Sequence, residues 1–175
     1  MKNEDGYRPF TGNGCTVRAD VVDVYIFRER EGRVEFLQLK RTREPLAGTW
    51  HPVMGHCEGD ETAVRCAIRE VLEETALDVR TGSARHMWAL EQTYPFFIHQ
   101  INTVVLSPRF AVEVSAEFVP TINDEHSDFR WVDEGDAEST FLWSGQKMAV
   151  REILSEFARS DSETSQRLRI DLDSA

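Results

Sequence analysis

The chain has 175 residues, 41% of them hydrophobic, and its 20 Lys and Arg against 31 Asp and Glu give a formal net charge of −11. This length and apolar content fit one globular domain with a sizeable core, and the acidic balance argues against sequence-independent binding of nucleic acid. No run of about 18 apolar residues occurs, and MKNEDGYRPF lacks the apolar core of a signal peptide, so neither a membrane span nor export is expected.

The first third of the chain predicts an arm followed by strands. Residues 1–15 are polar and predict an N-terminal arm or a short edge element. The segment 16–27 predicts one strand, because β-branched residues are dense in it and partly alternate with polar ones. A turn over REREG and a second strand at 34–39 complete a hairpin. A short strand at 49–54 then leads into a glycine-containing loop.

Residues 55–77, GHCEGDETAVRCAIREVLEETAL, are the most informative stretch. Apolar residues in its second half recur at the spacing of one helix face, at Val64, Ile68, Val71 and Leu72. A second face collects carboxylates, because Glu70 precedes Glu73 by three residues and Glu74 by four, and such residues are neighbours on a helix. These charges repel one another unless a cation lies among them, and oxygen-rich clusters of this kind suit Mg²⁺ or Mn²⁺.

The loop before this helix is expected to approach a ligand closely. Gly55 and Gly59 permit backbone angles that are closed to other residues. Asp60 is expected to cap the helix N-terminus. We interpret Glu61 as a brace for the loop, with Arg65 four residues further on as a partner.

A bare ExxEE run is usually a solvated helix face, so the spacing of the whole stretch has to decide. Glycine, five residues, glutamate, seven residues, Arg-Glu and then Glu-Glu fix six identities. At ordinary residue frequencies this pattern arises by chance in about one chain in 10⁵ of this length. The sequence therefore favours a functional cluster over a solvated face.

Beyond the helix, segments 78–92, interrupted near Gly82, and 98–106 each predict a strand, and 107–120 predicts a strand or a loop. The loop 93–97 between the first two contains Tyr94, Phe96 and Phe97. These aromatic residues either form a stacking platform for a heterocycle or plug the edge of the core.

The C-terminal part predicts one long helix and a tail. Residues 141–157 predict an amphipathic helix with Ser144 as its N-cap, and 160–175 form a polar tail that either adds an edge strand or is disordered. We find no repeat or linker, so 16–159 is expected to be one domain. Strands that alternate with two main helices predict an α/β sandwich.

The stretch 55–77 resembles the Nudix box, G-x5-E-x7-R-E-U-x-E-E-x-G-U, in which U is an aliphatic residue. The matching residues are Gly55, Glu61, Arg69, Glu70, Val71, Glu73, Glu74 and Leu77. One position departs, because Ala76 replaces the late glycine, and the helix exit is expected to differ in shape if that turn needs a positive φ. The resemblance covers about 17–157 and implies the Nudix fold, a mixed β-sheet between helices in an α/β/α sandwich.

The resemblance also implies a reaction, the hydrolysis of a nucleoside diphosphate linked to another group with the help of Mg²⁺, or of Mn²⁺. Glu73 and Glu74 would bind the metal, and Glu70 would act as ligand or base. Arg69 would orient these glutamates. Gly55 and Glu61 would support the loop.

Three further positions enter by the same resemblance, and a fourth, Trp50, enters by its residue type and its place in the chain. Met54 would offer its backbone carbonyl to the metal, where many relatives have glycine. Glu125 opens an E-H-x-x-x-x-W motif and would add a catalytic or metal-binding carboxylate, with Asp124 and Asp128 as competitors and a solvated acidic loop as the alternative. Arg41, in the basic cluster after the second strand, would face substrate phosphate, with a solvated basic turn as the alternative. Trp50, at the start of 49–54, would either lie in the core or contact a base.

The substrate follows from a narrower resemblance to a bacterial subfamily of dATP pyrophosphohydrolases and dihydroneopterin triphosphate diphosphatases. It rests on Trp-x-x-x-x-Gly before the box, EETALDV at its end, E-H-x-x-x-x-W and a Trp-Ser helix start. It implies that a nucleoside or pterin triphosphate is cleaved to a monophosphate and pyrophosphate, with Tyr94, Phe96 and Phe97 beside the heterocycle. It allows a homodimer, although no residue indicates one.

Three alternatives remain. The first is a Nudix hydrolase of ADP-ribose or diadenosine polyphosphate, and the second is a Nudix-like nucleotide-binding module without catalysis. The third is a zinc protein, whose ligands would be His51, His56, Cys57 and Cys66, although their spacing matches no zinc pattern. The three cysteines form no CxxC pair, which is typical of reduced thiols in the cytoplasm.

Overall fold

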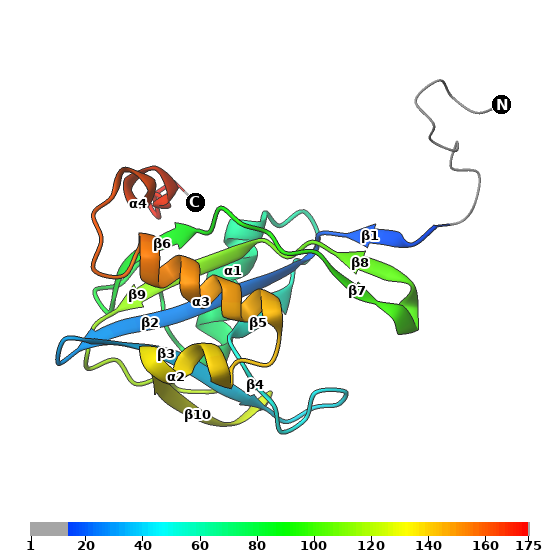
Figure 1. The fold of residues 1–175 in the computed structure, drawn as a ribbon, viewed down its shortest axis with the longest axis horizontal. Coiled ribbons are helices and arrows are strands. Elements are labelled where there is room, and N and C mark those ends of the chain that lie inside the picture. Colours follow the sequence, from blue (N-terminus) through cyan, green and yellow to red (C-terminus); the bar gives the residue numbers. More distant parts are fainter. Residues whose placement is uncertain (1–13, 175) are drawn as a thin grey trace.

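A computed structural model describes residues 14–174 of the chain (Figure 1). In chain order its elements are β1 (Thr16–Arg18), β2 (Val21–Arg30), β3 (Arg33–Arg41), β4 (Trp50–His51), β5 (Val53–His56), α1 (Ala63–Thr75), β6 (Ala84–Ala89), β7 (Phe96–Ile98), the 3₁₀ helix η1 (His99–Ile101), β8 (Thr103–Val105), β9 (Arg109–Val114), β10 (His126–Asp133), α2 (Glu134–Thr140), α3 (Ser144–Glu156) and α4 (Glu163–Leu168). The predicted arm 1–15 lies outside the described residues except for Gly14 and Cys15.

A mixed sheet forms the middle layer of the molecule. Its strand order is β10-β3-β2-β9-β6, with β4 added to β3 and β5 added to β2. The pair β2 and β9 is parallel, and the other pairs are antiparallel. Helix α1 covers one face, while α2 and α3 cover the other (Figure 1). The predicted α/β/α sandwich is confirmed.

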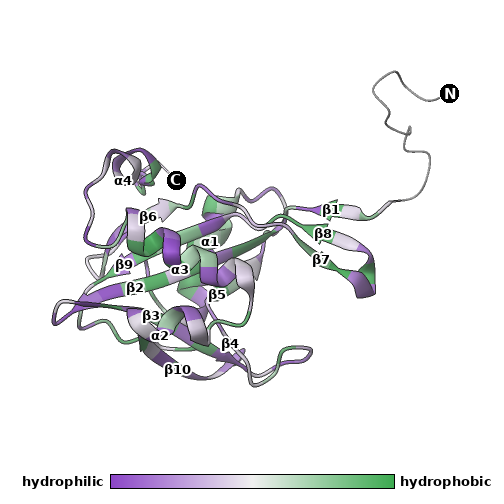
Figure 2. Ribbon diagram, in the orientation of Figure 1, coloured by the Kyte–Doolittle hydropathy of each residue, from purple (hydrophilic) through white to green (hydrophobic). Residues whose placement is uncertain are grey.

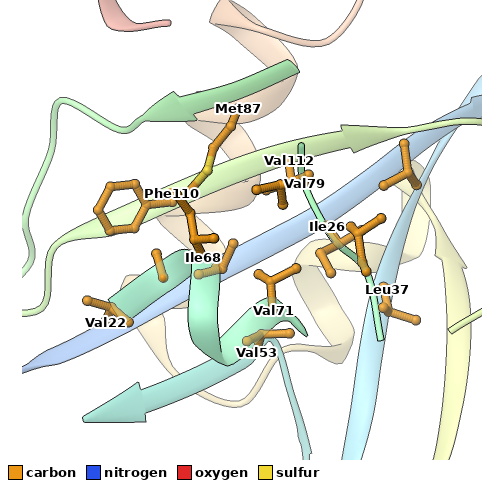
Figure 3. Close-up of a cluster of buried hydrophobic side chains, with 14 of the residues drawn as sticks. Val22, Ile26, Leu37, Val53, Ile68, Val71, Val79, Met87, Phe110 and Val112 are labelled. Atoms are coloured by element: carbon orange, nitrogen blue, oxygen red, sulfur yellow. The ribbon is translucent and has the colours of Figure 1, made fainter. Parts of the chain in front are cut away.

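Helix α1 is anchored by its apolar stripe. Ile68 and Val71 are buried and point toward the strands, where they meet residues such as Val22 and Val112 (Figure 3). The prediction that Leu72 belongs to this stripe is wrong, because its side chain is exposed. At 100° per residue, Leu72 lies more than a quarter turn past Val71 and leaves the buried face.

The second core lies between the sheet and α3. Tyr25 and Phe27 of β2 pack there with Val150 and Ile153 of α3. The predicted C-terminal helix is confirmed in part, because α3 begins at Ser144 and the N-cap is the preceding Trp143, not Ser144. The short helix α2, which the sequence did not reveal, covers the same face and buries little apart from Ala137.

A small second sheet, in the order β1-β8-β7, projects from the body (Figure 1). Two predictions fail here. The segment 16–27 is two strands in two sheets, because the chain leaves one sheet after Arg18 and enters the other at Val21. The segment 98–106 is not one strand, because η1 and the left-handed Asn102 turn the chain between β7 and β8. Figure 2 shows hydrophobic residues along both strands of this hairpin.

The remaining strands are shorter or differently placed than predicted. The first hairpin is confirmed, although β2 continues to Arg30 and the turn narrows to Glu31 and Gly32, both with positive φ. The segment 49–54 is split between β4 and β5 by Pro52, which has no N–H to donate. Of the segment 78–92, only β6 is a strand.

The C-terminal tail packs on the body. It forms α4, and a single bridge then joins Arg169 to Trp88 at the edge of the main sheet, where the Ile170 amide donates to the Met87 carbonyl. The tail was predicted either to add an edge strand or to be disordered, and in the structure it adds a single β-bridge to the edge of the sheet. Over residues 14–174, no helix combines the length and apolar character needed to cross a membrane.

Candidate active site

Arg69 lies at the centre of the acidic edge of α1. Its guanidinium donates to Glu61 through Nε and Nη2 at 3.1 and 2.9 Å, and to the carbonyl of His56 at 2.8 Å. Nη1 donates to Glu70 at 2.8 Å and to Glu73 at 3.1 Å. One cation therefore offsets the repulsion among three glutamates and fixes their orientation.

Glu61 contacts the loop before α1, and its cationic partner differs from the expected one. It binds Arg69 rather than Arg65, and it accepts a hydrogen bond from the Glu58 amide at 3.1 Å. The hydrogen bond with Arg69 lowers the pKa of Glu61. The expected Asp60 N-cap is wrong: α1 begins later, and Thr62 caps it by accepting from the Arg65 amide at 3.3 Å. A turn from Glu58 to Glu61 delays the helix start.

Glu70 is pressed against the strand that precedes the box. A Cβ placed on Gly55 would lie 1.8 Å from Cδ of Glu70, which is far inside van der Waals contact, so glycine is required there for close approach rather than for its φ. Burial is the main cause that raises the pKa of Glu70 to about 7. Arg69 opposes the rise, and the charges of Glu74 and Glu73 contribute to it. The carboxylates of this edge therefore interact electrostatically.

Glu74 is buried and binds a residue that the sequence did not single out. Nε2 of His126, at the start of β10, lies 3.0 Å from Oε2 of Glu74. Burial raises the pKa of Glu74, the bond to His126 opposes this, and the charge of Glu125 adds to the rise. Within the E-H-x-x-x-x-W motif it is therefore the histidine, His126, that contacts a glutamate of the box. The only signal for this role was the position of His126 beside Glu125.

Glu125 is the last residue before β10, in the segment between β9 and β10, and it lies next to the residues that follow β3. The Thr42 amide donates to the Glu125 carbonyl at 2.9 Å, and Arg43 lies 3.5 Å from its carboxylate, which is partly exposed. Arg41 pairs in register with His126, and Nε of Arg41 is buried without a hydrogen-bond partner. Both residues are therefore neighbours of His126, which contacts Glu74: Glu125 precedes it in the chain, and Arg41 lies opposite it on β3.

The model of the NUDIX domain matches residues 17–153 of the chain. The chain belongs to the NUDIX domain family. It is a hydrolase of that family, as the box predicted.

Two similar proteins share a substrate name. Over 116 residues the Nudix chain is 34% identical to the dihydroneopterin triphosphate diphosphatase of Haemophilus influenzae, which covers 62% of this chain and 70% of that protein. The structure of the E. coli dihydroneopterin triphosphate pyrophosphohydrolase matches with a TM-score of 0.67 at 25% identity, over 82% of this chain and 98% of that one.

A third similarity concerns the fold alone. A C. elegans Ap4A hydrolase, solved as a binary complex, matches with a TM-score of 0.68 at 19% identity, over 82% of this chain and 100% of that one. The Nudix fold of the chain is therefore shared with a protein that carries a different substrate name.

Nudix hydrolases generally use divalent metals such as Mg²⁺, and the carboxylates of this chain fit such an ion by their chemistry. All are oxygen donors, and the like charges that raise the pKa values of Glu70 and Glu74 are relieved by a nearby cation. Within residues 14–174 no three His, Cys, Asp or Glu side chains converge on one point. Arg69 lies among Glu61, Glu70 and Glu73, and His126 binds Glu74.

The predicted zinc ligands serve other contacts. His51 is buried and lies 2.5 Å from the Thr49 hydroxyl and 3.4 Å from the Gln146 amide. His56 is exposed at the end of β5, and Cys66 is buried in the core under α1. In the described part of this Nudix chain these side chains form no zinc-type cluster.

The aromatic residues are divided between two places. Phe96 and Phe97 are exposed on β7 of the projecting hairpin, so they do not plug the core. Tyr94 lies beside the N-terminus of α3, where its Cβ is 3.4 Å from the position of a Cβ on Gly145. Trp50 lies outside the two core clusters, and the guanidinium of Arg130 stands 4.2 Å from its ring centre.

Proposed function

We propose that this Nudix hydrolase cleaves a nucleoside or pterin triphosphate, with dihydroneopterin triphosphate or dATP as examples, to the monophosphate and pyrophosphate. The observation that carries the proposal is the acidic edge of α1, where Arg69 gathers Glu61, Glu70 and Glu73. The likeness to two enzymes named for dihydroneopterin triphosphate supports the choice of substrate.

The proposed cofactor is Mg²⁺, with Mn²⁺ as a substitute. The residues that would hold it are Glu70, Glu73, Glu74, Glu125 and the backbone carbonyl of Met54. A bound divalent cation would polarise the phosphorus–oxygen bonds and offset the charge of the polyphosphate, which a protein of net charge −11 otherwise repels.

The side chains of the protein supply orientation and proton transfer. Arg69 and Glu61 keep the acidic edge in shape, and His126 holds Glu74. Glu70 suits the role of proton acceptor for the attacking water, because its pKa of about 7 lies near neutral pH, where a general base works best. Glu125 is the alternative base. Arg41 is proposed to contact phosphate, and Tyr94, Phe96 and Phe97, with Trp50, to contact the heterocycle.

The test is the Mg²⁺-dependent release of pyrophosphate by wild-type protein, Glu73→Gln and Glu74→Gln. Each variant should lower kcat by on the order of 100-fold, the scale of losing a group that stabilises transition-state charge. Glu163→Gln, on the exposed surface of α4, is the matched control and should leave kcat unchanged. Near wild-type kcat in both site variants would contradict the proposal.

A panel of substrates distinguishes the proposed triphosphates from the other substrates of Nudix hydrolases. It contains dNTPs, dihydroneopterin triphosphate, diadenosine polyphosphates and ADP-ribose. Preference for ADP-ribose or a diadenosine polyphosphate would contradict the proposal that the substrate is a triphosphate. It would not contradict the proposed metal-dependent hydrolysis. Binding without turnover of any of them would favour a non-catalytic module.

We also propose a cytoplasmic site of action. Cys15, Cys57 and Cys66 are all free thiols, which is typical of a reducing compartment. A homodimer remains part of the proposal, and light scattering of the purified protein measures it.

A further inference from the structure

A group of buried polar side chains lies on the α3 side of the sheet, next to the site. Asp23 of β2 stands beside Arg109 of β9 in the parallel register and beside Met54 of β5 in the antiparallel one. Side chains alternate along β2, and Tyr25, two residues on, packs in the cluster under α3. Asp23 therefore points to the same face, one strand away from the residue that leads into the box.

Three polar atoms of this group have no hydrogen-bond partner. They are Oδ1 of Asp23, the hydroxyl of Tyr25 and the hydroxyl of Ser107, and all three are buried. A buried polar group without a partner costs about 1–3 kcal/mol of folding free energy, so each such group calls for an explanation. Asp23 retains 8% exposure, so a small part of the residue still reaches solvent.

The cation nearest to Asp23 is engaged elsewhere. Arg109 is buried and donates through Nε to the Gln92 carbonyl at 3.0 Å and through Nη1 to the Gly145 carbonyl at 2.7 Å. Its guanidinium lies 4.8 Å from the ring centre of Tyr94. Arg109 thus fixes the loop that carries Tyr94 against the start of α3 and leaves the Asp23 carboxylate without a hydrogen bond from it.

We propose that Asp23 is a specificity-determining residue that accepts hydrogen bonds from the ring N–H and the adjacent amino group of a 2-amino-4-oxo heterocycle, the edge that pterins and guanine share. This inference rests on the proposed hydrolysis of a heterocyclic triphosphate at the acidic edge of α1.

The choice of edge follows from hydrogen-bond chemistry. A carboxylate only accepts hydrogen bonds, and its two oxygens match two neighbouring N–H donors. Pterin and guanine present two such donors side by side, whereas adenine presents one donor beside a ring acceptor. A site that leaves a buried acceptor unpaired discriminates strongly against the ligand that lacks the donor. Asp23 therefore favours a pterin or guanine triphosphate over dATP.

The first experiment uses wild-type protein and compares kcat/KM for dihydroneopterin triphosphate, dGTP, dITP and dATP. Because dITP differs from dGTP only by the missing 2-amino group, kcat/KM should fall by about 10-fold or more from dGTP to dITP, the scale of one hydrogen bond to a charged group. Equal values for dGTP and dITP would overturn the inference. Hydrolysis of none of the four compounds would instead count against the proposed function.

The second experiment compares Asp23→Asn with the wild type. The amide pairs a donor with an acceptor, as adenine does, so the ratio of kcat/KM for dGTP to that for dATP should fall by about 10- to 100-fold. Asp20→Asn, one residue before the same strand and with its side chain exposed beside Arg18, is the control and should keep the wild-type ratio. An unchanged ratio in a folded Asp23→Asn protein that still hydrolyses triphosphates would refute the role of Asp23 and leave the function standing.

Discussion

The carboxylate of Glu70 lies so close to the backbone of Gly55 that no side chain fits between them: a Cβ would stand 1.8 Å from Cδ and 1.9 Å from Oε1. Glu70 is in turn held by Arg69 at 2.8 Å, so it cannot move away without breaking that ion pair. The first glycine of the box therefore determines where its central glutamate lies.

Gly55→Ala should displace Glu70 and lower kcat/KM by on the order of 100-fold, the cost of misplacing a reacting group by about 1 Å. Steady-state kinetics measure the loss, and thermal unfolding shows whether the fold persists. Gly82→Ala is the matched control, because a Cβ there meets nothing within 4 Å and the residue has no positive φ. Equal activity of Gly55→Ala and the wild type would contradict the contact.

Ala76→Gly should stabilise the protein. Ala76 ends α1 in the left-handed conformation, with φ of 56°, although it replaces the glycine of the box. The C-terminal end of the helix therefore has the left-handed turn that glycine adopts easily, and this conformation is strained for alanine. Glycine should raise the free energy of unfolding by about 1 kcal/mol at unchanged kcat. Ala76→Val should lower it, since branched residues tolerate positive φ least. Urea unfolding measures both changes.

His126→Leu should destabilise the fold by about 1–3 kcal/mol, because it leaves the buried carboxylate of Glu74 without its partner 3.0 Å away. His126→Asn retains a donor and should cost less. Chemical denaturation measures the free energy of unfolding of the wild type, His126→Asn and His126→Leu, which should decrease in this order. A leucine variant as stable as the wild type would show that Glu74 does not depend on this bond.

Stability should depend on pH through His51. Burial lowers the pKa of His51 to about 4, with a further contribution from the charge of Arg41. Between this value and the ordinary value of 6.5, the unfolded chain binds a proton that the folded chain does not. The stability that neutral His51 contributes is therefore complete above about pH 6.5 and is lost as the pH falls toward 4, up to about 3 kcal/mol.

The measurement compares the free energy of unfolding at pH 7.5 and pH 5. Wild-type protein should lose about 2 kcal/mol more than His51→Gln over this interval. His99→Gln, at an exposed histidine of η1, should lose as much as the wild type. Identical losses in the wild type and His51→Gln would show that His51 does not carry the effect.

The sequence predicted the features that short-range spacing controls. The helix, its acidic edge and the family follow from 55–77 alone, because residues three and four apart on a helix are neighbours whatever the rest of the fold does. The bond between His126 and Glu74 joins positions 52 residues apart, and only the pairing of β10 with β3 brings them together. Spacing along the chain carries no information on that pairing.

Failed predictions have physical reasons of the same kind. Arg65 and Arg69 are both within reach of Glu61 in principle, but the turn at Glu58 directs Glu61 toward Arg69. The strand break after Arg18 is invisible in a run of β-branched residues, since both halves are strands with suitable propensity. In the sequence Asp23 is one more polar residue of an alternating strand, because burial without a hydrogen-bond partner is a property of the folded chain alone.

Two segments of the chain run in parallel through both sheets. β1 runs beside β8 and β2 beside β9, and each chain passes from the small sheet to the main one through two or three residues, 19–20 and 106–108. Asp23 and Arg109 form the first rung beyond this crossing. The projecting hairpin is therefore continuous with the strand ends that carry Asp23 and Arg109. A shift of the hairpin relative to the body would reach these two buried residues through only two or three residues of backbone, whereas α1 belongs to neither segment.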